Sequence, residues 1–117
     1  MDKGNGLLED VRKTIDGLRY DTAKSEWIWT DTEGYPGEID TDFNSFEEGL
    51  YITPRSRRYF LAGRGGATTK YARRVADGTV AGDKVFPLSK EAAYEWAERV
   101  MPSSLLDLYF SDMVEDA

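Results

Sequence analysis

The segment from Gly49 to Gly66 constrains the fold of this chain more than any other stretch of its sequence. Residues 50–53 and 58–62 are short runs rich in apolar side chains, which would alternate between the two faces of a β-strand. Pro54 opens the basic turn between them, because proline has no backbone donor and suits the first corner of a turn. The segment therefore predicts a β-hairpin, followed by a flexible glycine-rich stretch at residues 63–66.

We expect this hairpin to belong to a small antiparallel sheet of three to four strands. An aromatic and β-branched run predicts a strand at residues 25–31, with Trp27 and Trp29 together on one face. A helix at residues 21–27 is the competing interpretation. A last strand is predicted at residues 84–88, where a proline indicates a strand end or a sheet edge.

The connections between these strands have weaker signals. Residues 39–48 predict an irregular loop or a short turn of helix, and residues 71–75 predict a helical turn. Asp77-Gly78 is a turn signal.

A first helix is predicted at residues 5–17, with Asn5 as N-cap and Gly17 just beyond its end. Its apolar residues recur at helical spacing and would form one stripe: Leu8, Val11, Ile15 and Leu18.

Two more helices are predicted near the C-terminus. Ser89 is a favourable N-cap for a helix at residues 90–101, which Pro102 would end. A last helix would follow, capped by Ser103 or Ser104. Together these elements predict one α+β domain over residues 1–117.

Charge is strongly segregated along the chain, whose formal net charge is −7. Residues 31–48 contain acids and no Lys or Arg: Asp31, Glu33, Glu38, Asp40, Asp42, Glu47 and Glu48. Residues 55–74 contain cations and no acid: Arg55, Arg57, Arg58, Arg64, Lys70, Arg73 and Arg74. The last helices are acidic again: Glu91, Glu95, Glu98, Asp107, Asp112, Glu115 and Asp116.

Composition excludes several classes of chemistry. The chain has no Cys and no His, so it cannot form disulfides, thiolate zinc sites or Ser–His and Cys–His catalytic pairs. A magnesium or calcium site built from carboxylates alone stays open. The glycines at 63–66 match neither phosphate-binding pattern, since Thr68 stands where a dinucleotide fold needs its third glycine. We therefore predict no cofactor, no metal and no catalytic residues.

The sequence also lacks the signals that direct a chain to a membrane. No apolar run approaches the roughly 18 residues of a membrane-spanning helix. The N-terminus has no basic region leading into an apolar one, as a signal peptide would. We expect a cytoplasmic protein.

Five segments between residues 19 and 98 carry a resemblance to known proteins. They are Arg-Tyr-Asp-Thr-Ala-Lys at 19–24, Leu-Tyr-Ile-Thr at 50–53, Tyr-Phe-Leu-Ala-Gly-Arg-Gly-Gly at 59–66, Lys-Tyr at 70–71 and Pro-Leu-Ser-Lys-Glu-Ala-Ala-Tyr-Glu-Trp-Ala-Glu at 87–98. This pattern resembles a family of small, mostly uncharacterised proteins of bacteria, their phages and other mobile elements. The resemblance implies an accessory role, including interference with host defence, and provides no catalytic residues.

Three functions are compatible with these observations. The favoured one is a non-enzymatic inhibitor, similar to an anti-CRISPR protein, whose acids at 31–48 and on the last helices occupy a basic nucleic-acid channel of a CRISPR effector in the host cell. The first alternative is a regulatory module that binds nucleic acid through the basic hairpin, although the overall charge opposes this. The second is an enzyme using a carboxylate pair, Asp40 with Asp42 or Glu47 with Glu48.

The charged segments also have interpretations that involve no binding site. Acidic residues commonly do no more than solvate a surface, and the basic segment would balance the acidic one within the fold or across a homodimer.

Overall fold

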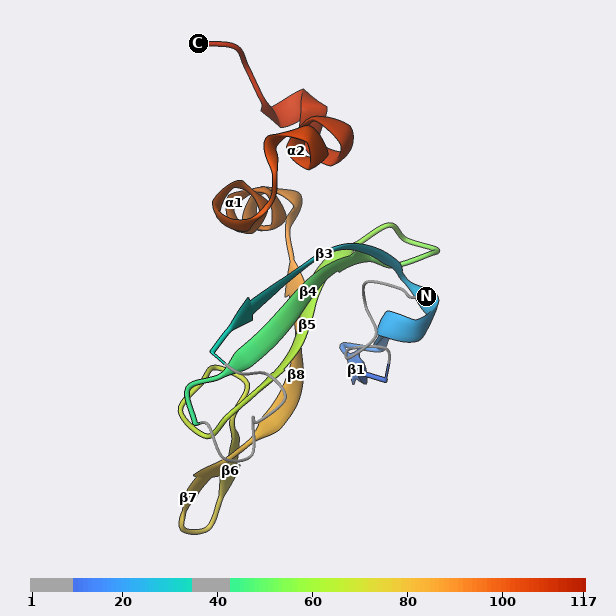
Figure 1. Cartoon of the computed structure of the whole chain (residues 1–117). Coiled ribbons are helices and arrows are strands. Elements are labelled where there is room, and N and C mark those ends of the chain that lie inside the picture. Colours follow the sequence, from blue (N-terminus) through green and yellow to red (C-terminus); the bar gives the residue numbers. More distant parts are fainter. Residues whose placement is uncertain (1–9, 35–42) are drawn as a thin grey trace.

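A computed structural model describes residues 10–34 and 43–117 (Figure 1). Its centre is a four-stranded antiparallel sheet in the order β3-β4-β5-β8. The strands are β3 (Glu26–Glu33), β4 (Phe46–Ile52), β5 (Tyr59–Gly65) and β8 (Gly82–Leu88). The chain is mixed α+β, as predicted, but it has more strands than the three to four expected.

The central hairpin is confirmed, and both of its strands are longer than predicted. β4 and β5 pair in continuous register from Ile52 opposite Tyr59 to Phe46 opposite Gly65. The expected loop or helical turn is therefore wrong for residues 46–48, which begin β4. The expected flexible glycine stretch is wrong for Gly63 and Gly65, which continue β5.

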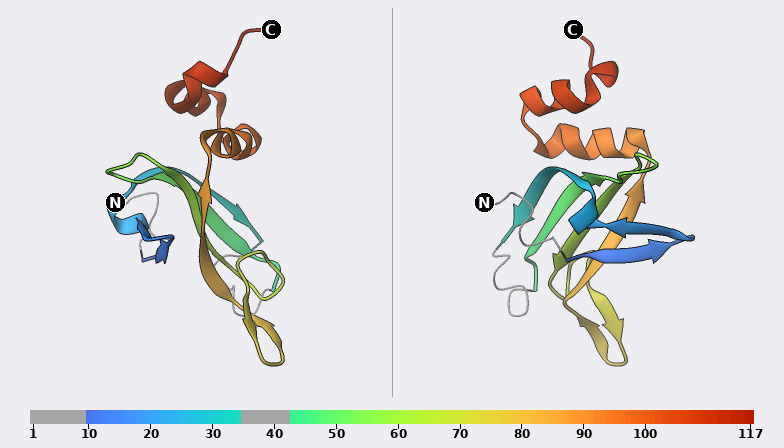
Figure 2. Two further views of the ribbon diagram at one scale, coloured as in Figure 1. Left: turned by 180° about the vertical axis from the view of Figure 1, so that it is seen from behind. Right: turned by 90° about the vertical axis from the view of Figure 1, so that its right-hand side faces the viewer.

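Both faces of the sheet are covered, as Figure 2 shows. Helices α1 (Lys90–Val100) and α2 (Ser103–Phe110) lie on one side, and a hairpin of β1 (Arg12–Ile15) and β2 (Leu18–Asp21) lies on the other. Short 3-10 turns, Thr22–Lys24 and Ser111–Met113, follow β2 and α2.

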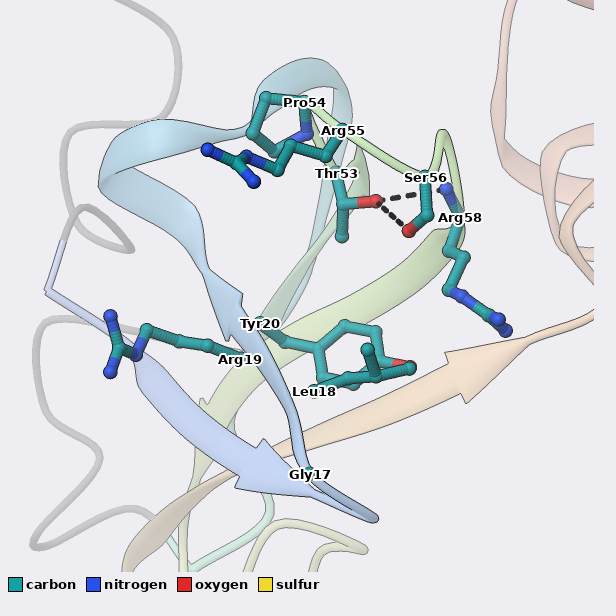
Figure 3. A pocket seen from close by; sticks show the side chains of 9 residues that line it. All are labelled: Gly17, Leu18, Arg19, Tyr20, Thr53, Pro54, Arg55, Ser56 and Arg58. Atoms are coloured by element: carbon teal, nitrogen blue, oxygen red, sulfur yellow. Dashed lines mark hydrogen bonds between the residues drawn. The ribbon is translucent and has the colours of Figure 1, made fainter.

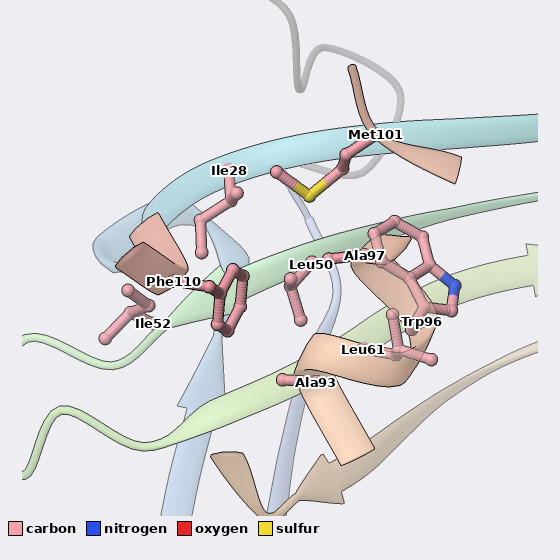
Figure 4. Packing of buried hydrophobic residues seen from close by; sticks show 9 residues of the cluster. All are labelled: Ile28, Leu50, Ile52, Leu61, Ala93, Trp96, Ala97, Met101 and Phe110. Carbon is pink, nitrogen blue, oxygen red and sulfur yellow. The ribbon is translucent and has the colours of Figure 1, made fainter. Parts of the chain in front are cut away.

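The core beneath the helices joins strands β3, β4 and β5 to both helices (Figure 4). Its buried members come from β3, β4, β5, α1 and α2 and from the junction between the helices: Ile28, Leu50, Ile52, Leu61, Ala93, Trp96, Ala97, Met101 and Phe110. Phe110 is fully buried and stacks on Tyr59 with ring centroids 5.5 Å apart. Burying one such side chain stabilises the fold by roughly 2–3 kcal/mol, so Phe110 fixes α2 against the sheet.

A second core lies beneath the β1–β2 hairpin. It contains Val11, Tyr20, Tyr51, Phe60, Ala62 and Val85. Tyr20 meets Phe60 edge to face with ring centroids 5.2 Å apart, which attaches the hairpin to β5.

The predicted N-terminal helix is wrong for the described part of residues 5–17, and its stripe residue Leu8 lies outside the described residues. The chain forms the β1–β2 hairpin there, with Ile15 opposite Leu18. Asp16 and Gly17 make its two-residue turn, with φ of 53° and 80°. Positive φ at both positions is the turn geometry that matches strand twist, and Asp-Gly is among its strongest sequence signals.

Gly17→Ala is expected to lower the free energy of unfolding by about 1 kcal/mol, because an L-residue is strained at this φ. Gly17→Asn should lose less, since asparagine tolerates the left-handed conformation. Urea unfolding measures both variants, and equal losses for Ala and Asn would contradict this account of the turn.

Trp27 and Trp29 do not share a face, because β3 contains a β-bulge between them. Trp27 pairs with Tyr51 and Trp29 pairs with Leu50, so Ile28 is an extra residue without a partner in the register. Trp27 packs against the core beneath the β1–β2 hairpin, and Trp29 packs against the core beneath the helices. The bulge thus shifts the alternation by one residue.

The helical turn predicted at residues 71–75 is also wrong. Strands β6 (Arg73–Val75) and β7 (Gly78–Val80) form a two-stranded ribbon across the turn predicted at Asp77-Gly78. This ribbon projects from the end of β5 and β8 opposite the helices (Figure 1).

The C-terminal predictions hold for the elements and fail for one cap. Ser89 Oγ accepts the Ala92 backbone N–H at 3.0 Å and begins α1 as expected. Pro102, and not Ser103 or Ser104, is the N-cap of α2, and its carbonyl accepts the first helical hydrogen bonds. Strand β8 lies at the sheet edge, in agreement with Pro87.

Within residues 10–34 and 43–117, no helix has both the length and the apolar character that crossing a membrane requires.

Candidate functional site

The acids predicted to form a partner surface at 31–48 divide into three groups. Glu38, Asp40 and Asp42 lie outside the described residues. Near the end of β3, Asp31 is half-buried and Glu33 is exposed. Glu47 and Glu48 are 3% and 4% exposed, so the structure removes both from any accessible acidic surface.

Glu48 is the centre of a buried polar network under α1. Its Oε1 accepts hydrogen bonds from the Tyr71 hydroxyl at 2.6 Å and from Lys70 Nζ at 2.7 Å. Its Oε2 accepts one from Trp96 Nε1 at 2.7 Å. The network thus joins β4, the segment after β5 and helix α1.

Ionisation of Glu48 is favoured despite its burial. Burial alone would raise the pKa of this carboxyl, but hydrogen bonds from Lys70, Trp96 and Tyr71 outweigh it and hold the pKa below its usual value. The pKa of Tyr71 is raised strongly, first by burial and then by the neighbouring Glu48 charge. Tyr71 is therefore a fixed hydrogen-bond donor and a poor proton source.

Glu47 points to the opposite face of β4. It lies opposite Arg64 in the register, and Arg64 Nη2 also contacts Asp10 Oδ1 at 2.5 Å. Burial raises the pKa of Glu47, and the Arg64 charge opposes this increase only in part. Because adjacent strand residues face opposite sides, Glu47 and Glu48 do not form a paired-carboxylate site.

Asp31 is the carboxylate that lies across the strand pair from Glu48. Burial raises its pKa, and the charges of Glu48 and Glu33 raise it further, whereas the Thr32 backbone N–H and Arg99 oppose the shift. Both Glu48 oxygens are already engaged by donors, so Glu48 is not free to act as a base. Among the described residues, no group of three or more acids is placed to hold a metal ion.

Helix α1 carries a row of three exposed acids. Glu91, Glu95 and Glu98 recur at one-turn intervals and are all exposed, opposite the buried Trp96 and Ala97. We refer to these three glutamates as the acidic face of α1. Glu98 accepts a hydrogen bond from the Tyr94 hydroxyl at 2.9 Å, which helps to orient one carboxylate.

Helix α2 adds an exposed acid and an exposed leucine. Asp107 is exposed, and Leu108 beside it is 69% exposed, which is unusual for a large apolar side chain. Asp112 pairs with Lys90 at 2.5 Å, and this hydrogen bond lowers its pKa.

The predicted basic surface is divided between two ends of β5. Arg55, Arg57 and Arg58 are exposed on the β4–β5 turn, whereas Arg73 and Arg74 are exposed on the β6–β7 ribbon at the other end (Figure 1). Arg64 and Lys70 between them are engaged with Asp10 and Glu48. The cations therefore do not form one continuous track for a nucleic-acid backbone.

Sequence reasoning missed the network around Glu48. Its members are distant in the chain, and the one available signal was an acid that directly precedes the apolar part of a strand. Extending the predicted strand to residue 46 would have shown that Glu48 shares a face with Leu50 and Ile52.

Comparisons with protein-family models, with curated proteins and with solved structures found no match to this chain. The resemblance to mobile-element proteins therefore stays a prediction.

Proposed function

We propose that this chain is a non-enzymatic interaction protein whose acidic face on α1 binds a basic protein surface in competition with nucleic acid. The observation that carries the proposal is the exposed row of Glu91, Glu95 and Glu98 on a helix that Trp96 fixes to the sheet. A row held by a rigid element keeps its geometry on binding, which limits the entropy lost on association.

The spacing of this row supports competition with a phosphate backbone. At a rise of 1.5 Å per residue, the three carboxylates are separated along the axis by about 6 Å and about 4.5 Å. A DNA strand carries one charge per about 3.4 Å of helix axis, so the two charge densities agree within a factor of two. The net charge of −7 adds long-range attraction to a basic channel.

Leu108 on α2 provides an exposed apolar side chain, and Asp107 next to it in the sequence adds a further exposed charge. Interfaces gain most of their affinity from a few desolvated side chains, and charge mainly sets the association rate and specificity. Together with the predicted resemblance, these features favour a CRISPR effector, whose channel holds nucleic acid through its backbone, as the partner.

The test uses purified guide-loaded CRISPR effectors and measures their binding to target DNA by mobility shift with this chain as competitor. For an effector that the wild type inhibits, Glu91→Gln/Glu95→Gln/Glu98→Gln should weaken inhibition at least about tenfold, because three charge contacts are lost. Raising the salt concentration should weaken the wild type in the same direction.

A matched control removes three exposed charges elsewhere, by Asp16→Asn/Asp77→Asn/Asp83→Asn. It should inhibit like the wild type. Equal inhibition by the wild type and the α1 variant would refute the acidic face as the site, and failure of the wild type against every effector tested would refute the defence-complex role.

The two alternatives have less support. A nucleic-acid-binding module is disfavoured by the division of the basic residues between the two ends of β5. For a carboxylate-dependent enzyme, one of the two suggested pairs, Glu47 with Glu48, faces opposite sides of the sheet.

A further inference from the structure

Leu108 on helix α2 points away from the core of its own chain. Successive residues of a helix are turned by about 100°, so Leu108 lies about 160° around α2 from Phe110. Phe110 is fully buried in the core beneath the helices, whereas Leu108 is 69% exposed. The side of α2 that carries Leu108 therefore stays open to a contact from outside.

The sequence around Leu108 is acidic. Asp107 directly precedes it and is exposed, and residues 100–117 contain four acids and no Lys or Arg. A surface that receives Leu108 thus has to be apolar where the leucine enters and cationic beside it.

The chain itself has a pocket with these properties, between the β1–β2 hairpin and the β4–β5 turn (Figure 3). Leu18 and Tyr20 line it from β2, and Thr53 and Pro54 line it from the turn. Its volume is about 230 Å³. Sites for drug-sized ligands measure about 300–1,000 Å³, so this pocket has room for a side chain and little more.

Arginines flank the pocket. The residues that line it include Arg19, Arg55 and Arg58 and no acid. All three arginines are exposed, and Figure 3 shows their guanidinium groups extending away from the pocket to two different sides. They are therefore placed to meet acids on either side of an entering side chain, and they leave the pocket itself to an apolar group.

We propose that the pocket of one copy of this chain receives Leu108 from α2 of a second copy, with Asp107 beside the flanking arginines. The β1–β2 hairpin and α2 lie on opposite sides of the sheet, so the leucine comes from another copy (Figure 2). Each copy then presents one surface of each kind, and the contact joins copies head to tail instead of as a two-fold pair. Burial of Leu108 supplies the attraction, and the complementary charges select the orientation.

Sedimentation equilibrium of the full chain from about 10 μM to about 1 mM, the range of weak association, measures this contact. The mean mass of the wild type should rise with concentration above that of the monomer. Leu108→Ser should weaken the association at least about tenfold, because it removes the side chain that becomes buried. Val80→Ser is the matched control, since Val80 is an apolar residue, 36% exposed, on the β6–β7 ribbon, and this variant should associate like the wild type.

A second variant changes the other surface. Arg55→Glu/Arg58→Glu places acids beside the pocket and should abolish self-association at the same concentrations, because these acids repel Asp107. Both arginines are exposed, and the amide spectrum verifies that the variant is folded. Arg73→Glu/Arg74→Glu makes the same change of charge on the ribbon and should associate like the wild type.

A mixture of two variants, each defective on one surface, tests the pairing directly. The Leu108→Ser chain keeps the pocket, and the Arg55→Glu/Arg58→Glu chain keeps α2. Each chain alone should be monomeric, whereas an equimolar mixture should form a 1:1 pair that adds no further copies. Amide shifts should then change at residues 17–20 and 53–58 of the Leu108→Ser chain, and at residues 104–112 of its partner.

Three results would overturn the proposal. They are a wild type that stays monomeric up to 1 mM, no difference between the arginine variant and its ribbon control, and no pair in the mixture. The contact does not involve Glu91, Glu95 or Glu98, so these results leave the proposed role of the acidic face of α1 untouched.

Discussion

Replacing Glu48 with alanine should lower the free energy of unfolding by about 3–5 kcal/mol at neutral pH, the usual loss when one partner of a buried ion pair is removed. The change leaves the Tyr71 hydroxyl and Trp96 Nε1 without their shared acceptor in a buried site, and each such group has a desolvation penalty. Urea unfolding followed by tryptophan fluorescence measures the loss.

Glu47 provides the matched comparison, because it is the adjacent residue, is equally buried and has the opposite pKa shift. The raised pKa of Glu47 means that folding favours the neutral form of this side chain. Its contribution to the free energy of unfolding is therefore complete below the unfolded pKa of about 4.3 and is lost as pH rises. Glu47→Gln should therefore leave stability unchanged or raise it at neutral pH.

The pH dependence of stability has the opposite sign for Glu48, whose pKa is lowered in the folded state. Its contribution is present above about pH 4.3 and disappears as pH falls through the folded pKa. The difference between wild type and Glu48→Ala should consequently shrink in acid. A difference that stays constant with pH, or a loss from Glu47→Gln as large as that from Glu48→Ala, would contradict the described network.

Gly63→Ala is expected to lower the free energy of unfolding by about 3 kcal/mol, at the upper end of the usual range for overpacking. A Cβ at this position would lie 2.4 Å from Tyr71 Cζ and 2.6 Å from the Glu47 carbonyl oxygen. Tyr71 cannot turn away without losing its hydrogen bond to Glu48, and the carbonyl belongs to the backbone of β4.

Gly17→Ala serves as the control for this loss, since it adds the same methyl group where no atom lies within 4 Å. Thermal and urea unfolding should rank Gly63→Ala well below Gly17→Ala in stability. If the two variants are equally stable, the Tyr71 ring does not lie over Gly63.

Elements with mutually consistent local signals could be predicted from the sequence. α1 has a serine cap, an acid in its first turn and apolar residues on one side, and all of these indicate the same helix. The β4–β5 hairpin likewise combines alternation with a proline turn. In both cases the local preference agrees with the tertiary packing.

The N-terminal region misled the prediction because two signals conflicted. Val11, Ile15 and Leu18 have helical spacing, but Asp16-Gly17 favours a two-residue hairpin turn, and the hairpin packs Tyr20 against Phe60. The bulge in β3 has no clear signal at Ile28, so the separation of Trp27 from Trp29 could not be read from alternation.

The candidate sites were harder to predict because they depend on tertiary contacts. The acidic face of α1 follows from helical spacing once the helix is known. The buried state of Glu48 requires Lys70, Tyr71 and Trp96 from other elements. Such contacts between distant segments are determined by tertiary packing and leave no pattern in the local sequence.

The bulge in β3 has a consequence for how this protein behaves at high concentration. An open sheet has two rows of unpaired backbone groups, which can recruit another chain and start aggregation. Here β3 is distorted by its bulge, and β8 contains Pro87, which lacks a donor, and Lys84, which is charged. Neither border of the central sheet is a regular template for strand addition, so strand pairing between copies through this sheet is disfavoured.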